Sequence, residues 1–283
     1  MGDVKSRSHV PGAALRALLV VVLVILPAMV VPATAPETAQ SILLLAVFAG
    51  GIVFAEYASD YPGLIEFRFA APFNRTRFAL VAVLAVMLSL LLRNSVEPGT
   101  IGGLALRIAA VCGAAMDFSL SPVRLLLSAL PDGLPESHLL MVRDGAAMAF
   151  VLALTTVAGF VTAIRLNAWP MGSGPFNVWL NLPTFDPTAG NDVVLRLQRH
   201  ARINILLGML MPFLLAGAVI ASAMLIRPLS LVSPMGYVWG ITVWAYLPAS
   251  MIMRGVAMAR VARMIRASRR RLADSEGGAY VSA

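Results

Sequence analysis

The sequence predicts an all-α, polytopic membrane protein that forms a single integral membrane domain with about six transmembrane helices. The 283 residues are 59% hydrophobic and only 13% charged, whereas soluble domains carry about 25% charged residues. The apolar residues form long continuous runs, as transmembrane helices require. A membrane β-barrel would instead show alternating segments of about ten residues, so a helical fold is the better prediction.

The first predicted span covers residues 13–33, directly after a basic N-terminal segment. The small residues Ala33-Thr34-Ala35 are typical of a signal-peptide cleavage site. However, Pro36 would follow the cut, and the apolar run is long for a signal peptide. We therefore expect this segment to be retained as a membrane span.

The remaining apolar runs predict five further spans, at residues 39–55, 78–92, 146–164, 203–226 and 237–253. Four of these runs are followed directly by an arginine, which marks the point where a span meets water. The last two runs contain Pro212 and Pro248. A membrane helix tolerates proline when neighbouring groups satisfy the carbonyl that it leaves free.

Residues 101–130 are apolar but contain Arg107, Asp117, Pro122 and Arg124. An arginine at the centre of a span costs about 2.5–3.5 kcal/mol, and a proline interrupts the helix. With six spans most basic residues lie on the side of both termini, whereas a seventh crossing would move those before residue 78 to the other side. Because Lys and Arg are enriched in cytoplasmic loops, we predict cytoplasmic termini and a re-entrant or interfacial helical element at 101–130.

Ionisable residues at membrane depth are candidates for a functional site, and Arg107, Asp117 and Arg124 form the candidate polar site of this chain. The alternative is an interfacial position in which both arginines reach into the headgroups. The next loop holds His138 among several acidic residues, which would be the acid–base groups of a membrane enzyme. No catalytic residue is assigned, because no Ser or Cys nucleophile has a defined context there.

Metal and cofactor sites are not predicted. The three histidines lie far apart in the sequence, and the chain has one cysteine. No pair of histidines has the spacing of zinc or haem ligands, and a single cysteine cannot form an internal disulfide.

Two segments on the predicted cytoplasmic side are rich in aromatic residues. Residues 66–78 read EFRFAAPFNRTRF, and the loop at 167–191 contains two tryptophans, four prolines and no basic residue. Orientation in the membrane requires the arginines but not the aromatic residues, so the latter indicate a surface that meets a partner or lipid. Its candidate residues are Phe67, Arg68, Phe69, Arg75, Arg77, Trp169 and Trp179.

Residues 254–272 predict a basic amphipathic tail that leaves the last span along the inner membrane face. Each basic residue near anionic lipid contributes about 1 kcal/mol. The predicted anionic-lipid anchor consists of Arg260, Arg263, Arg266 and Arg270. No nucleic-acid-binding motif accompanies these arginines, so the predicted partners are a bilayer with anionic headgroups and another membrane protein or a second copy of this chain.

Of the 22 Lys and Arg residues, all but Lys5 are arginine, a bias typical of chains from GC-rich bacteria. We therefore expect a multi-pass protein of the bacterial cytoplasmic (inner) membrane. The first functional hypothesis is a non-catalytic protein that organises or assists assembly of a partner membrane complex through its cytoplasmic aromatic and arginine loops. The alternatives are a small-solute transporter or permease with a polar site around Arg107 and Asp117, and a membrane enzyme that uses the periplasmic acids and His138.

Overall fold

The computed structural model describes residues 10–32, 34–61, 63–166, 169–170, 176–185, 192–225 and 231–281, without the side chains of 222–225 and 275–281. These residues form helices and connecting segments, with no β-strand among them. The helices are α2 (Val10–Val30), α3 (Pro36–Ala58), α4 (Phe73–Val96), α5 (Thr100–Ala115), α6 (Pro122–Ser128), α7 (Glu136–Arg165), α8 (Val178–Asn181), α9 (Val193–Leu225) and α10 (Pro234–Val281).

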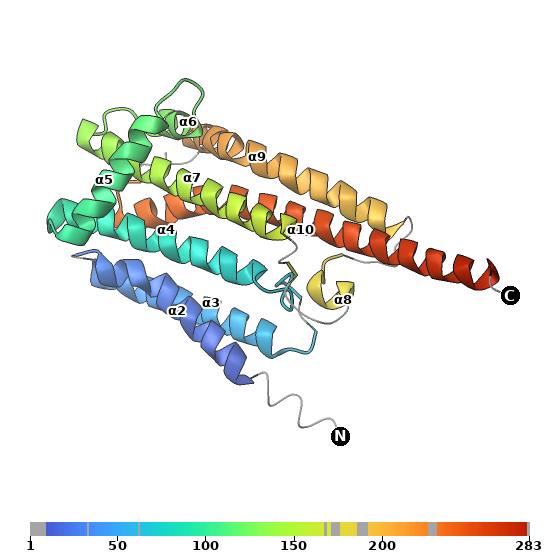
Figure 1. The fold of residues 1–283 in the computed structure, drawn as a ribbon. Helices are drawn as coiled ribbons and strands as arrows, with labels where there is room; N and C mark the ends of the chain where they lie inside the picture. Colours follow the sequence, from blue (N-terminus) through green and yellow to red (C-terminus); the bar gives the residue numbers. More distant parts are fainter. Residues whose placement is uncertain are drawn as a thin grey trace.

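Six helices, α2, α3, α4, α7, α9 and α10, are long and apolar enough to cross a membrane. This confirms the prediction of a polytopic helical membrane protein with six spans. Helix α10 lies at the centre, where it packs on α9, α7 and α4 (Figure 1). The α2–α3 hairpin packs on the outside of this group, mainly through α4.

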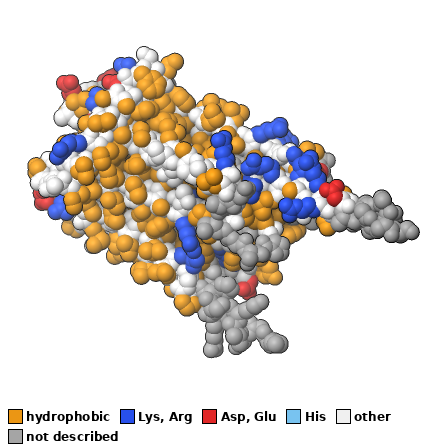
Figure 2. Space-filling view, viewed as in Figure 1, with side chains coloured by type: hydrophobic (Ala, Val, Ile, Leu, Met, Phe, Trp, Pro, Cys, Tyr) orange, Lys and Arg blue, Asp and Glu red, His pale blue; other side chains and the backbone are white. Residues whose placement is uncertain are grey.

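The outer surface of the bundle is apolar over a broad area (Figure 2). Side chains such as Leu44, Phe48 and Leu206 are exposed on it. Exposed apolar side chains in this number would be unstable in water, but they are what a lipid-facing helix presents to hydrocarbon.

Arginines mark one end of the bundle, which we call the arginine end. In four of the six spans an arginine stands at the boundary of the apolar run on this side, and these are Arg77, Arg165, Arg202 and Arg254; in a fifth span, α2, Arg16 lies in the second turn. The first residues of α2 and the basic half of α10 lie at this same end (Figure 1). An even number of spans requires this arrangement, because each span reverses the direction of the chain.

Helices α5 and α6 lie at the opposite end, where α5 packs on α7 and α4 (Figure 1). Helix α5 has 16 residues, which is about 24 Å of helix and less than the roughly 30 Å of a hydrocarbon core. A turn at Met116–Leu120 then separates it from the 7-residue α6. Residues 101–130 therefore form two short helices, and neither belongs to the six that are long and apolar enough to cross a membrane.

The basic tail differs from the expectation. Residues 254–272 do not form a separate helix after the last span, because α10 continues without a break from Pro234 to Val281, over 48 residues. Residues 254–276 contain no proline, and helix-favouring Ala, Arg, Met and Leu dominate them. The N-terminal half of α9 runs beside this extension (Figure 1). We call Asp192 with residues 193–202 of α9, together with residues 255–274 of α10, the arm.

Helices α9 and α10 approach closely at two glycines. A Cβ atom added at Gly255 would lie 2.7 Å from the Ala201 carbonyl oxygen, and one at Gly208 would lie 2.9 Å from the Pro248 carbonyl oxygen. Both distances are shorter than a van der Waals contact, and the obstacle is backbone, which cannot rotate away. These glycines therefore set the spacing at which the arm leaves the bundle.

Gly255→Ala should lower the free energy of unfolding by about 1–3 kcal/mol, since α9 and α10 must move apart to admit the methyl group. Gly217→Ala in α9 is the matched control, because its added Cβ meets no atom within 4 Å. Unfolding of the purified protein in detergent measures both variants. Equal stability of the two would show that the close approach at Gly255 does not hold the helices together.

Candidate functional site

The segment between α3 and α4 is held by a carboxylate at the end of α3. Both oxygens of Glu56 accept hydrogen bonds from backbone N–H groups, with Gly63 at 3.1–3.2 Å, Leu64 at 2.9 Å and Ile65 at 3.0 Å. Arg68 donates to the backbone carbonyls of Glu56 and Ser59. These bonds fold residues 59–61 and 63–68 back over the end of the helix and bring Glu66 and Phe67 to the bundle.

Phe67 has a left-handed backbone with a φ of 54°, which is uncommon for a bulky residue. Its N–H donates to the Asn181 carbonyl at 2.6 Å, and the Phe69 N–H donates to the Asn181 side-chain oxygen at 3.1 Å. The segment before α4 is thus fastened to α8. The unusual backbone turns the Phe67 ring inward.

An aromatic cluster surrounds Phe67 beneath the arginine end. Its ring lies 4.6 Å from Phe73 and 5.6 Å from Trp169, centre to centre. Phe160 and Phe176 complete the cluster. The Trp169 indole N–H donates to the Ala70 carbonyl at 3.0 Å, so its polar group is satisfied inside the protein.

The predicted aromatic surface therefore needs correction. Phe67 and Trp169 are 1% and 0% exposed, so neither ring can contact a partner in this structure. The cluster at their positions closes the gaps between α4, α7 and the 176–185 segment. The sequence could not show this, because the burial of Phe67 depends on its left-handed backbone and on its contact with Asn181, 114 residues later.

Phe69 and Trp179, in contrast, are exposed at the arginine end. Arg68 lies 4.5 Å from the Phe69 ring, as in a cation–π contact. Arg77 lies between the rings of Phe73 and Tyr246, at 5.4 and 5.7 Å, and Arg75 is exposed.

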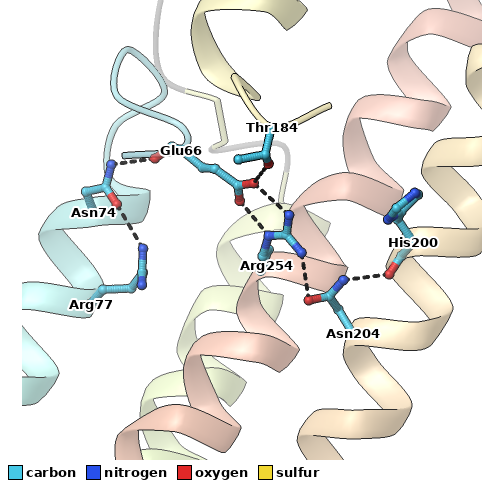
Figure 3. A network of polar contacts seen from close by, with 7 residues as sticks. All are labelled: Glu66, Asn74, Arg77, Thr184, His200, Asn204 and Arg254. Atoms are coloured by element: carbon cyan, nitrogen blue, oxygen red, sulfur yellow. Dashed lines mark hydrogen bonds and ion pairs between the residues drawn. The ribbon is translucent and has the colours of Figure 1, made fainter. Parts of the chain in front are cut away.

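A polar network joins four parts of the chain at the arginine end (Figure 3). Arg254 of α10 holds the Glu66 carboxylate with two hydrogen bonds, at 2.5 and 2.6 Å. Thr184 donates to the same carboxylate at 2.8 Å, and the third Arg254 nitrogen donates to the Asn204 side-chain oxygen of α9 at 2.9 Å. The Glu66 side chain is 11% exposed, so this pair lies largely out of water.

The backbone of Glu66 extends the network to α4. Its carbonyl accepts a hydrogen bond from the Asn74 amide at 2.8 Å, and Arg77 donates to the Asn74 side-chain oxygen at 3.3 Å. Sequence reasoning missed Glu66 and Arg254 as partners, since 188 residues separate them. The available signal was that Arg254 is the first charge after the last apolar run.

The arm carries the greatest concentration of positive charge. Its two helices contain nine arginines and two aspartates, and their basic side chains gather at the arginine end of Figure 2. Asp192 pairs with Arg269 at 2.6 Å, and this hydrogen bond lowers the pKa of Asp192. Between the helices, the seam of the arm is apolar and buried; it includes Val194, Leu197, Ala257, Met258, Val261 and Ala262.

Two hollows open on the arm close to the polar network. The larger, of about 300 Å³, lies between α9 and α10; its lining residues are Gln198, Ala201, Arg202, Ile205, Val256, Ala259 and Arg263. The smaller, of about 250 Å³, is lined by Leu195, Gln198, Arg199, Arg202 and Ile203. Gln198 and Arg202 belong to both.

The candidate polar site at the opposite end is only partly assembled. Asp117 lies 3.3 Å from Arg124 and 3.7 Å from Arg143, and Arg143 also pairs with Asp144 at 2.8 Å. Arg107 is exposed on α5 and takes part in none of the ion pairs of the described chain. Asp117 and Arg124 themselves are 39% and 53% exposed. Among the described residues, no three His, Cys, Asp or Glu side chains come together as metal ligands.

Comparison of the chain with protein-family models, with curated proteins and with solved structures found no match in any of the three. The features that remain for a functional assignment are therefore the arm, its two hollows and the polar network at its base.

Phe67→Ala should lower the free energy of unfolding by about 3–5 kcal/mol, because it empties the centre of the aromatic cluster. Phe69→Ala, two residues away and half exposed, should change it by no more than about 0.5 kcal/mol. Unfolding in detergent distinguishes the two variants. If Phe67→Ala were as stable as the wild type while a bound partner was lost, Phe67 would belong to a contact surface after all.

Glu66→Gln should lower the free energy of unfolding by about 1.5–3 kcal/mol, since it removes charged hydrogen bonds from the half-buried Arg254. The matched control is Glu97→Gln, which removes an ion pair to Arg93 in which both side chains are more than half exposed; its cost should be at most about 1 kcal/mol. The double variant Glu66→Leu with Arg254→Met should recover part of the loss, because it leaves no unpaired charge. Equal effects of Glu66→Gln and Glu97→Gln would contradict a structural role for the network.

Proposed function

We propose that this chain is a non-catalytic protein of a bacterial inner membrane, and that it organises or assists assembly of a partner membrane complex. The arm is the surface that carries this proposal. It is a rigid, strongly basic pair of helices that projects from a six-span bundle. Such a surface would bind an acidic segment of a partner protein.

The orientation follows from the charge distribution. Lys and Arg are enriched on the cytoplasmic side of membrane proteins, and the arginine end holds the arm together with Arg16, Arg77 and Arg165. We therefore propose that the arginine end, both termini and the arm lie in the cytoplasm. The short helices α5 and α6 then lie on the periplasmic side.

The distal part of the arm stands clear of the lipid. Arg270 and Arg271 follow Arg254 by 16 and 17 residues, which is about 24–26 Å along α10. The headgroup layer on each side of a bilayer is only roughly 5–8 Å thick. Arg270 is one of the four residues of the predicted lipid anchor, and Arg271 follows it; at this distance along the helix both exposed arginines favour a protein partner over lipid.

The rigidity of the arm favours the same role. Leu197, Met258 and Val261 are fully buried in its seam, and the Asp192–Arg269 pair ties the two helices together near the distal end. Binding to a preorganised surface costs less conformational entropy than binding to a flexible tail. Arginine clusters attract acidic segments over several ångströms and speed association at low salt.

The role is tested by purification from the native membrane in mild detergent. We expect one partner at about equimolar amount with the wild-type chain, and a loss of at least about tenfold with Arg270→Glu and Arg271→Glu together, since each reversal replaces attraction by repulsion. The matched control is Arg107→Glu, an exposed arginine at the opposite end, which should retain the partner.

Raising the salt concentration should weaken the wild-type complex in the same way, because exposed charges are screened. Co-purification of the same partner in the same amount with all three proteins would overturn the assignment of the arm. Circular dichroism and the elution volume of each variant confirm that the fold is intact.

A further inference from the structure

The base of the arm differs from its distal end because its hollows combine arginine with apolar side chains. Three arginines and Gln198 line the two hollows, together with aliphatic residues of α9 and α10. No acidic residue lines either hollow. In the described chain, no ion pair neutralises Arg199, Arg202 or Arg263.

The depth of the larger hollow matches the headgroup layer. Ala201 of α9 lies level with Gly255, one residue past the first charge of α10. Val256 and Ala259 follow Arg254 by two and five residues, which places them about 3–8 Å beyond the end of the apolar run. The headgroup layer extends over roughly this distance.

The arginines converge on this level from opposite directions. Side chains on a helix lean toward its N-terminus. The N-terminus of α10 lies on the membrane side, so Arg263 leans back toward the bundle. The N-terminus of α9 lies at the distal end of the arm, so Arg202 leans away from the bundle. The Arg202 guanidinium thus approaches the hollow from the bundle side, and the Arg263 guanidinium approaches it from the distal side of the arm.

We propose that the hollow between α9 and α10 binds one anionic phospholipid. The headgroup phosphate lies between Arg202 and Arg263, with Gln198 as a further donor, since arginine forms paired hydrogen bonds with phosphate. The acyl chains run from Ile205 over the exposed apolar face of α9, where Leu206 and Met209 face outward. Ile205 and Val256 line the hollow, and the exposed Leu206 follows Ile205 directly; apolar side chains beside the arginines favour a lipid over a free anion.

This site does not depend on the proposed partner of the arm. The partner is assigned to the distal arginines, whereas the lipid lies at the base. The loss of one therefore leaves the other measurable.

The test uses the full-length chain, stripped of lipid in detergent and titrated with phosphatidylglycerol, with phosphatidylcholine or with inorganic phosphate. Native mass spectrometry counts the bound lipids, and thermal unfolding reports the binding constant. We expect one saturable phosphatidylglycerol molecule, stabilisation that phosphatidylcholine does not reproduce, and no effect of inorganic phosphate at the same concentration. If inorganic phosphate stabilised the protein as much as phosphatidylglycerol does, the assignment of a lipid would be overturned and the hollow would be a free-anion site.

Four variants separate the hollow from general attraction to a charged surface. Arg202→Gln and Arg263→Gln should each weaken phosphatidylglycerol binding by about tenfold or more, as expected for the loss of a charged hydrogen bond. Ala259→Leu fills the hollow and keeps every charge, and it should weaken binding as well. Arg75→Gln removes an exposed arginine from the first turn of α4 at the same end, and it should leave binding unchanged.

Two results with these variants would also overturn the proposal. One is an equal loss of affinity with Arg75→Gln, which would show unspecific attraction. The other is unchanged binding with Ala259→Leu, which would place the lipid elsewhere. Both results remain decisive if Arg202→Gln or Arg263→Gln fails to fold. Ala259→Leu retains the net charge, and Arg75→Gln lies outside the arm.

Discussion

The ion pair between Glu66 and Arg254 connects the parts of the chain that build the arginine end. Through it the α3–α4 segment, the 176–185 segment and helices α9 and α10 share one set of hydrogen bonds. A charged pair that is largely shielded from water is costly unless its geometry is good and its remaining donors and acceptors are satisfied. Thr184 and Asn204 supply those additional bonds. Phe67 of the aromatic cluster follows Glu66 directly, and the α10 part of the arm follows Arg254 directly. The network therefore positions both the cluster and the arm.

The features that sequence predicted correctly depend on local composition. A helix that crosses a membrane must be long and apolar over consecutive residues, so the six spans were visible as runs. Pro122 and the charges at 101–130 likewise indicated that this stretch is not one long helix, and it forms two short helices. The arginines that end the spans were equally clear, because they follow the apolar runs directly in the sequence.

The features that sequence did not predict depend on contacts between distant segments. Phe67 was assigned to a surface, but its left-handed backbone and its bond to Asn181 turn it inward. Residues 254–272 were expected to lie on the membrane, since their pattern is amphipathic. Their apolar stripe instead packs on the first turns of α9, and a helical pattern alone cannot distinguish a lipid surface from a neighbouring helix. The Glu66–Arg254 pair joins residues 188 apart, so no helical or strand spacing in the sequence relates them.

The unbroken course of α10 has a mechanical consequence. Its central span and the arm belong to one helix, so the arm moves with any tilt of that span. The 20 residues of α10 that belong to the arm, 255–274, measure about 30 Å, and a tilt of about 10° would displace their end by roughly 5 Å. Spans tilt in response to bilayer thickness. A helix of this kind converts a change in the thickness of the lipid into a displacement of a charged surface in the water beyond it.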